Sequence, residues 1–150
     1  MARTLPFRRT AAHHSKTMLL PMQRASVDEL SLRYHLALDA LGRGAGTLES
    51  AQLVTEAVLS TGFLKEAGYG AISYETIRCA EQHSNALFQC GKDDGEWRFD
   101  DAAHACLAQV LTAHDQQLFS ARLADVIAAA DRLDRLKAGL PDHVRQQKRA

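Results

Sequence analysis

Two cysteines and a histidine lie close together in the segment RCAEQHSNALFQC, residues 78–90. Thiolates and imidazoles are the ligands that zinc prefers. If this segment is an α-helix, Cys79, His83 and Cys90 lie within about 40° of one face. Cys90, however, would be about 16 Å from Cys79 along the helix axis, too far for one shared ion. Cys79 and His83, one turn apart, remain as a candidate pair of ligands.

A second helix beginning near residue 101 offers further ligands. If it packs antiparallel to the first, around a turn centred near residue 96, His114 approaches Cys79 and His83. Glu75 or Asp115 would then complete a tetrahedral zinc site. The metal-site hypothesis therefore names Cys79, His83 and His114.

Two other interpretations of the cysteines stand beside this one. The same antiparallel pairing places Cys90 near His104 and Cys106, where a disulfide between the two cysteines is an alternative. Unpaired cysteine also packs as a small apolar residue. The sequence has no Cys-x2-Cys or His-Glu-x2-His spacing, so packing is the favoured interpretation and no cofactor is expected.

Signals for catalysis are weak. His114 and Asp115 are adjacent, and neighbours on a helix point about 100° apart, so they do not form an acid–base pair. His35 is a further candidate base, but no Gly-x-Ser-x-Gly motif supplies a nucleophile. The glycines of GRGAGT, residues 42–47, lack the lysine of a phosphate-binding loop. We expect a protein that is not an enzyme and has no catalytic residue.

Charge is distributed unevenly along a chain whose formal net charge is zero. Residues 1–24 carry five basic and no acidic side chains, residues 25–131 seven basic and sixteen acidic, and residues 132–150 six basic and two acidic. Flexible basic ends can neutralise phosphates without reading base sequence. Candidate nucleic-acid contacts are therefore Arg3, Arg8, Arg9, Lys16, Arg24, Arg145, Lys148 and Arg149.

Hydrophobic periodicity predicts four helices. The first begins at a capping box, Ser26 with Glu29, and ends at the glycines near residue 42. The second runs from a Thr47 cap to about residue 67, and the third from a Ser73 cap to Gly91. The fourth runs from residue 100 or 101 to about 138, with a break possible near residues 114–120. Residues 1–25 are expected to be a flexible basic arm and residues 141–150 a basic tail around one helical domain, 26–140.

These elements predict an all-α protein, a bundle of about four helices with a long C-terminal helix and flexible basic termini. The long helix outlasts its partners, so its apolar residues would lack cover and form a partner interface: Leu133, Leu136 and Leu140. A protein partner or a homodimer follows as an expectation. No apolar run is long enough to span a membrane, and three cysteines fit no disulfide framework, so a cytoplasmic protein is expected.

Three motifs resemble short helical proteins of unknown function that are encoded in bacteriophages and prophages of proteobacteria. They are YHLALDALGRG at 34–44, FLKEAGYG at 63–70 and AHDQQL at 113–118, and their order and spacing look similar over about residues 26–135. The resemblance implies a mobile-element origin and a compact helical fold, and it lends no catalytic residues. We therefore expect a regulatory or interaction protein acting by protein–protein contact. A DNA-associated regulator and a zinc-binding helical protein are the alternatives.

Overall fold

Helices account for nearly all of the regular structure in this chain. The computed structural model describes residues 16–139. After a single helical turn at 16–19, five helices follow: α2 (Arg24–Gly42), α3 (Leu48–Glu66), α4 (Tyr74–Asp94), α5 (Asp101–Ser120) and α6 (Leu123–Lys137). No β-strand occurs between residues 16 and 139. The predicted all-α class is confirmed.

The side-chain caps predicted at Thr47 and Ser73 are present, and the structure adds a third at Asp100. Thr47 accepts a hydrogen bond from the backbone N–H of Ser50, Ser73 from Thr76, and Asp100 from Ala103. These bonds satisfy donors that the first turn of a helix leaves unpaired. The capping box at Ser26 is wrong: α2 begins at Arg24, and the carbonyl of Gln23 accepts from the N–H groups of Ser26 and Val27.

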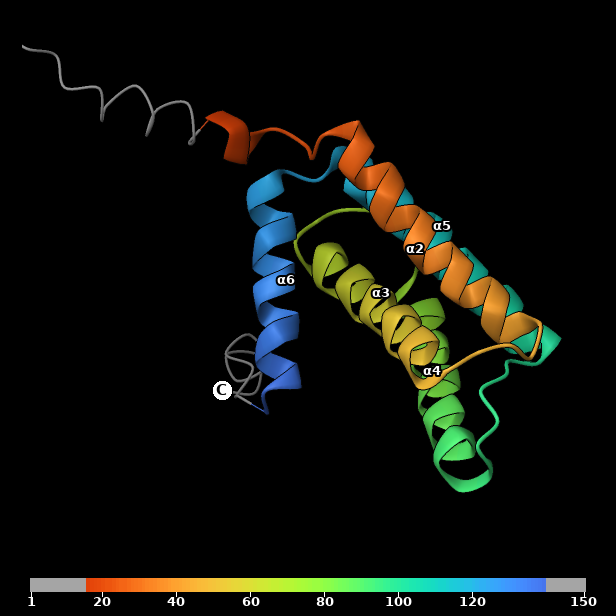
Figure 1. Cartoon of the computed structure of the whole chain (residues 1–150). Coiled ribbons are helices and arrows are strands. Elements are labelled where there is room, and N and C mark those ends of the chain that lie inside the picture. The colour runs from red at the N-terminus through yellow and green to blue at the C-terminus, as the bar shows by residue number, and fades with distance from the viewer. Residues whose placement is uncertain (1–15, 140–150) are drawn as a thin grey trace, which may run out of the picture.

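One core lies between the four helices α2, α3, α4 and α5, and α3 contacts each of the other three. α2 and α5 lie side by side (Figure 1). They run antiparallel, because Phe99 just before α5 donates to Leu41 near the end of α2, whereas Leu20 before α2 accepts from Leu123 after α5. The largest fully buried apolar side chains of this core are Leu41, Val54, Val58, Leu107, Val110 and Leu111.

The predicted long C-terminal helix is in fact two helices, α5 and α6, separated by a break. The helix stops at Ser120, and both Ala121 (ψ 141°) and Arg122 (ψ 142°) adopt extended backbone before α6 begins. Two contacts from distant segments occupy the backbone donors released there. The N–H of Arg122 donates to the Tyr69 hydroxyl at 3.3 Å, and that of Leu123 to the Leu20 carbonyl at 2.8 Å.

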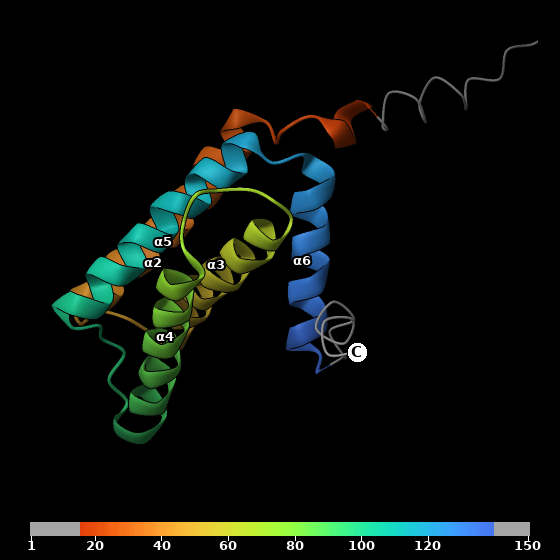
Figure 2. The ribbon, with the colours of Figure 1, turned by 180° about the vertical axis from the view of Figure 1, so that it is seen from behind.

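The break turns α6 back beside α3 (Figures 1 and 2). Leu133 is therefore buried in a second core cluster with Phe63 and Leu118, and Leu136 packs against the same cluster. Ion pairs of Arg132 with Glu66 and of Lys137 with Glu56 join α6 to α3 along the edge. The predicted open stripe is thus covered at Leu133 by α3, within the same chain.

Candidate metal site between α4 and α5

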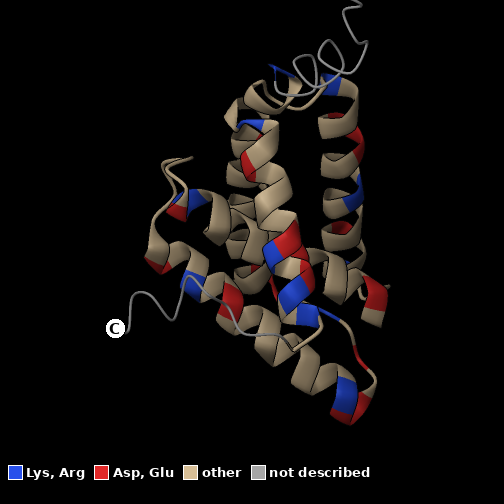
Figure 3. Cartoon of the chain, turned by 90° about the vertical axis from the view of Figure 1, so that its left-hand side faces the viewer, with Lys and Arg blue, Asp and Glu red and all other residues tan. Residues whose placement is uncertain are grey.

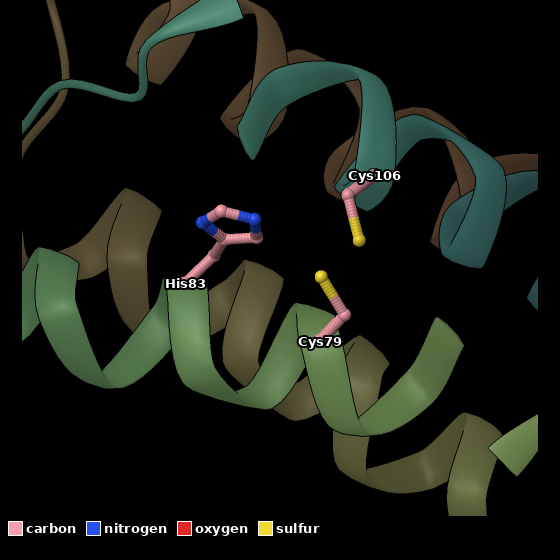
Figure 4. A group of neighbouring side chains, drawn as sticks. All are labelled: Cys79, His83 and Cys106. Atoms are coloured by element: carbon pink, nitrogen blue, oxygen red, sulfur yellow. The ribbon is translucent and has the colours of Figure 1, made fainter. Parts of the chain in front are cut away.

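A candidate metal site lies between α4 and α5, and α4 provides two of its three donors. Its inward face is set by the buried Ile77 and Ala80. Cys79 and His83 are one turn apart beside that face, and both are half-buried. Their side chains point from α4 into the space in front of α5 (Figure 4).

Cys106 on α5 completes a cluster of three donors. The Sγ atoms of Cys79 and Cys106 and a ring nitrogen of His83 all lie within 4.8 Å of one another. Bonds of about 2.3 Å to sulfur and about 2.0–2.1 Å to nitrogen would place tetrahedral ligand atoms about 3.5–3.8 Å apart. Side-chain adjustments of about an ångström would therefore bring the three atoms around one ion (Figure 4).

The Cys106 thiol is not an activated nucleophile. Burial, followed by the adjoining Cys79 thiol, raises the pKa of the Cys106 thiol to about 11. Cys106 also lies 3.8 Å from the carbonyl oxygen of Thr76, to which its S–H is directed. A thiol in this state stays protonated at neutral pH, whereas a bound cation would displace the proton and favour the thiolate.

His114 is not part of the cluster, so the metal-site hypothesis drawn from the sequence was wrong in its third ligand. Its side chain is buried, its Nδ1 lies 3.3 Å from Oε1 of Gln117, and its ring contacts Tyr34 with 5.7 Å between centroids. Burial lowers the pKa of His114, opposed by the hydrogen bond to Gln117 and by Asp115. His114 is a neutral core residue at the interface of α5 with α2.

The connection between α4 and α5 explains this correction. α4 continues to Asp94 and ends at Gly95, whose φ of 71° is the left-handed conformation that favours glycine. The next residues return over the core: Trp97 packs against Gly91, and Phe99 is buried beside Leu41. Because this return is not a direct turn, Cys106 rather than His114 lies against Cys79.

The alternatives involving Cys90 also fail. Cys90 is exposed, and all three cysteines are free. His104, predicted near Cys90, instead lies against Gly42, where an added Cβ would be 2.7 Å from its Cδ2 atom. The alternative of a disulfide between Cys90 and Cys106 is therefore absent, and Cys90 is a natural control for experiments on the cluster.

Asp115 pairs with His35, from α2, and not with the cluster. Nε2 of His35 lies 2.7 Å from Oδ2 of Asp115, and both side chains are partly exposed. Within residues 16–139, no serine or cysteine is hydrogen-bonded to His35. The pair joins α2 to α5, and it lacks the hydroxyl or thiol partner that covalent catalysis would need.

The sequence contained a signal for Cys106 that the simple hairpin prediction overlooked. Trp97 and Phe99 are both apolar and lie in the eight residues, 92–99, that separate the third predicted helix from the fourth. Burying both rings requires the connection to fold back over the core, which changes the axial offset between the two helices.

Most of the predicted nucleic-acid contacts lie outside the described residues, as does Leu140. Lys16 and Arg24 are described and exposed. Figure 3 shows basic and acidic residues interspersed among the helices. No helix within residues 16–139 is long and apolar enough to cross a membrane.

No family model, curated protein or solved structure matches this chain.

Proposed function

We propose that this chain binds one thiophilic divalent ion, zinc in the first instance, through Cys79, His83 and Cys106. The observation that carries the proposal is the convergence of these three donor atoms, within 4.8 Å of one another, from two helices. Two sulfurs and one imidazole nitrogen are a ligand set typical of zinc and unsuited to magnesium or calcium.

The position of the cluster suits an ion entering from solvent. All three residues are half-buried at the edge of the α4–α5 interface, so the ion is accessible and a water molecule or an added ligand can take a fourth position. Bound there, the ion would link α4 to α5. Because the unfolded chain does not hold the three donors together, binding would stabilise the folded state.

We propose a structural rather than a catalytic role for the ion. The only carboxylate–imidazole pair described in the structure is His35 with Asp115. Asp115 lies nine residues after Cys106 on α5, about 13 Å along the axis. A proton relay between that pair and an ion at Cys106 has no geometric support.

Cobalt titration tests the metal site. Co²⁺ in a site with two thiolates gives intense sulfur-to-metal absorption and visible d–d bands, and we expect saturation near one ion per chain. Cys106→Ala and His83→Ala should weaken binding at least about tenfold, since each removes one ligand. Cys90→Ala removes an exposed cysteine of α4, the helix that carries Cys79 and His83, and should leave binding unchanged. Equal losses in Cys90→Ala and Cys106→Ala, or no thiolate band at all, would contradict the proposal.

A second candidate function is contact with another protein through the outer face of α2. The side chains of Leu32 and Leu36 are 59% and 58% exposed, one turn apart. Regulation of a mobile element by such a contact rests on the resemblance of the three motifs described above. Exposed leucines also occur singly on ordinary surfaces, but two in one row form a continuous apolar ridge.

Site-specific photo-crosslinking in cells tests this contact. A photo-reactive residue at position 36 should give a discrete crosslinked product. The same residue at position 48 is the control, because Leu48 is 48% exposed but lies at the start of α3. Crosslinking of equal yield and pattern at both positions would refute a contact specific to α2.

A further inference from the structure

The outer face of α2 has an apolar ridge that no other part of residues 16–139 covers, since the side chains of Leu32 and Leu36 are more than half exposed there. At about 100° per residue, Leu36 points away from the side that carries the buried Val27 and Leu38. Leu32 and Ala40 flank Leu36 at one turn on either side, forming a row of residues spaced by four. Such rows are the ridges through which two helices pack. In Figure 1 α2 lies in front of α5, with its outer face toward the viewer.

Within about 60° of Leu36 around the helix axis, the charged residues alternate in sign along α2. From the N-terminal end they are Glu29, Arg33, Asp39 and Arg43, and all four are exposed. Glu29 and Arg43 are each seven residues from Leu36, and Arg33 and Asp39 are each three residues from it. Residues equally distant from Leu36 therefore carry opposite charges.

This arrangement selects one geometry for a second copy of the same helix. In an antiparallel pair that crosses at Leu36, each acidic residue is level with a basic residue of the other helix. Glu29 and Arg43 lie within about 20° of the line through Leu36, so their side chains face across the contact. A parallel pair in register would set like charges level with one another, and so would an antiparallel pair centred at Tyr34.

We infer that α2 is a self-association face on which a second copy of this chain packs antiparallel, about a two-fold axis at Leu36. This inference rests on the second proposed function and names its partner. Leu36 meets Leu36 of the partner subunit, and Leu32 packs beside Ala40 of the partner subunit. Glu29 pairs with the partner's Arg43, and the reverse pair follows from symmetry. The antiparallel helix dipoles add to the attraction.

The contact is small, which sets the expected behaviour in solution. One helix crossing buries less than the roughly 1,200 Å² at the lower limit of stable interfaces, so the two copies should exchange in a concentration-dependent equilibrium. Arg43 already bonds to Asp39 in the same helix, at 3.1 Å from Nε to Oδ1. Because that pair is exposed, its loss on reorientation of Arg43 costs little.

Sedimentation equilibrium with two charge-reversed variants tests the inference. Glu29→Arg sets arginine against arginine, and Arg43→Glu sets glutamate against glutamate, so each variant alone should associate at least about tenfold more weakly than the wild type. An equimolar mixture restores opposite charges and should recover association. Leu36→Lys should abolish it, whereas Leu48→Lys, on another exposed leucine, should not. Unchanged helical circular dichroism would show that the variants are folded.

Three results would overturn the inference: a wild-type chain that stays at 16.5 kDa at the highest soluble concentration, association that survives Leu36→Lys, or a mixture no stronger than its components. The wider contact function would fail separately. If position 36 crosslinks to a different protein in cells while the purified chain remains a monomer, contact through α2 stands and self-association is wrong.

Discussion

The buried amide of Gln117 should contribute more to stability than any other polar side chain on α5. It is fully buried, and its Nε2 donates to the carbonyl oxygens of Thr61 at 3.0 Å and Tyr69 at 3.2 Å. Its Oε1 lies 3.3 Å from Nδ1 of His114. One side chain thus joins α5 to the end of α3 and to the connection that follows it.

Gln117→Ala removes these contacts without replacing them. Two hydrogen bonds at about 1 kcal/mol each are lost, and a buried partner such as the His114 nitrogen left unsatisfied adds about 1–3 kcal/mol. The free energy of unfolding should therefore fall by about 3–5 kcal/mol. For a protein of this size, that corresponds to a decrease of about 10 °C in the melting temperature. Urea unfolding monitored by circular dichroism measures the change.

Gln116→Ala is the matched control, because the neighbouring Gln116 is exposed on the same helix. Both variants make the same chemical change and have the same effect on helix propensity. Gln116→Ala should change the free energy of unfolding by no more than about 0.5 kcal/mol. If the two variants differ by less than about 1 kcal/mol, the buried network does not have the stabilising role assigned to it.

Three further predictions follow from the packing and the pKa shifts. Gly91→Ala should lower the free energy of unfolding by about 1–3 kcal/mol, because the added Cβ would lie 2.4 Å from the Trp97 ring. Gly62→Ala has no neighbour closer than 3.7 Å and should raise the free energy of unfolding by up to about 1 kcal/mol. Urea unfolding midpoints in the opposite order would refute this pair of predictions. Burial lowers the pKa of His114, so the unfolded state binds more protons than the folded state as the pH falls through about 6.5. The free energy of unfolding should therefore decrease between pH 7.5 and 5.5, and it should decrease less in His114→Leu. An equal decrease in both proteins would mean that another group titrates. Because the pKa of the Cys106 thiol is about 11, zinc must displace its proton on binding. Competition titrations should therefore show a zinc affinity that rises at least about tenfold per pH unit from pH 6.5 to 8.5. An affinity that does not change with pH would exclude this thiol as a ligand.

The helices inside the core could be predicted because their signals are local. Thr47, Ser73 and Asp100 each bond to a backbone N–H three residues ahead, and such a bond requires only the first turn of the helix. The start of α2 was misplaced because no side-chain cap forms there and Ser26 lies within the first turn. A capping motif shows that a bond is available but not that the chain uses it.

The candidate site could be predicted only in its half on α4. Cys79 and His83 are one turn apart on a single helix, so the periodicity of that helix is enough to pair them. The third donor depends on the axial offset between α4 and α5. Burial of Trp97 and Phe99 sets that offset by returning the connection over the core, which exchanges His114 for Cys106.

The sequence by itself determined the all-helical class, the caps at Thr47 and Ser73 and the inward faces, because neighbouring residues on one helix control each of these features. Only the tertiary structure decided the break at Ala121 and Arg122 and the burial of Leu133. No glycine or proline marks that break, and the released N–H groups find partners in Tyr69 and Leu20, residues that are distant in sequence. A helix ends wherever outside contacts satisfy its backbone better than its own next turn, and those contacts exist only once the chain has folded.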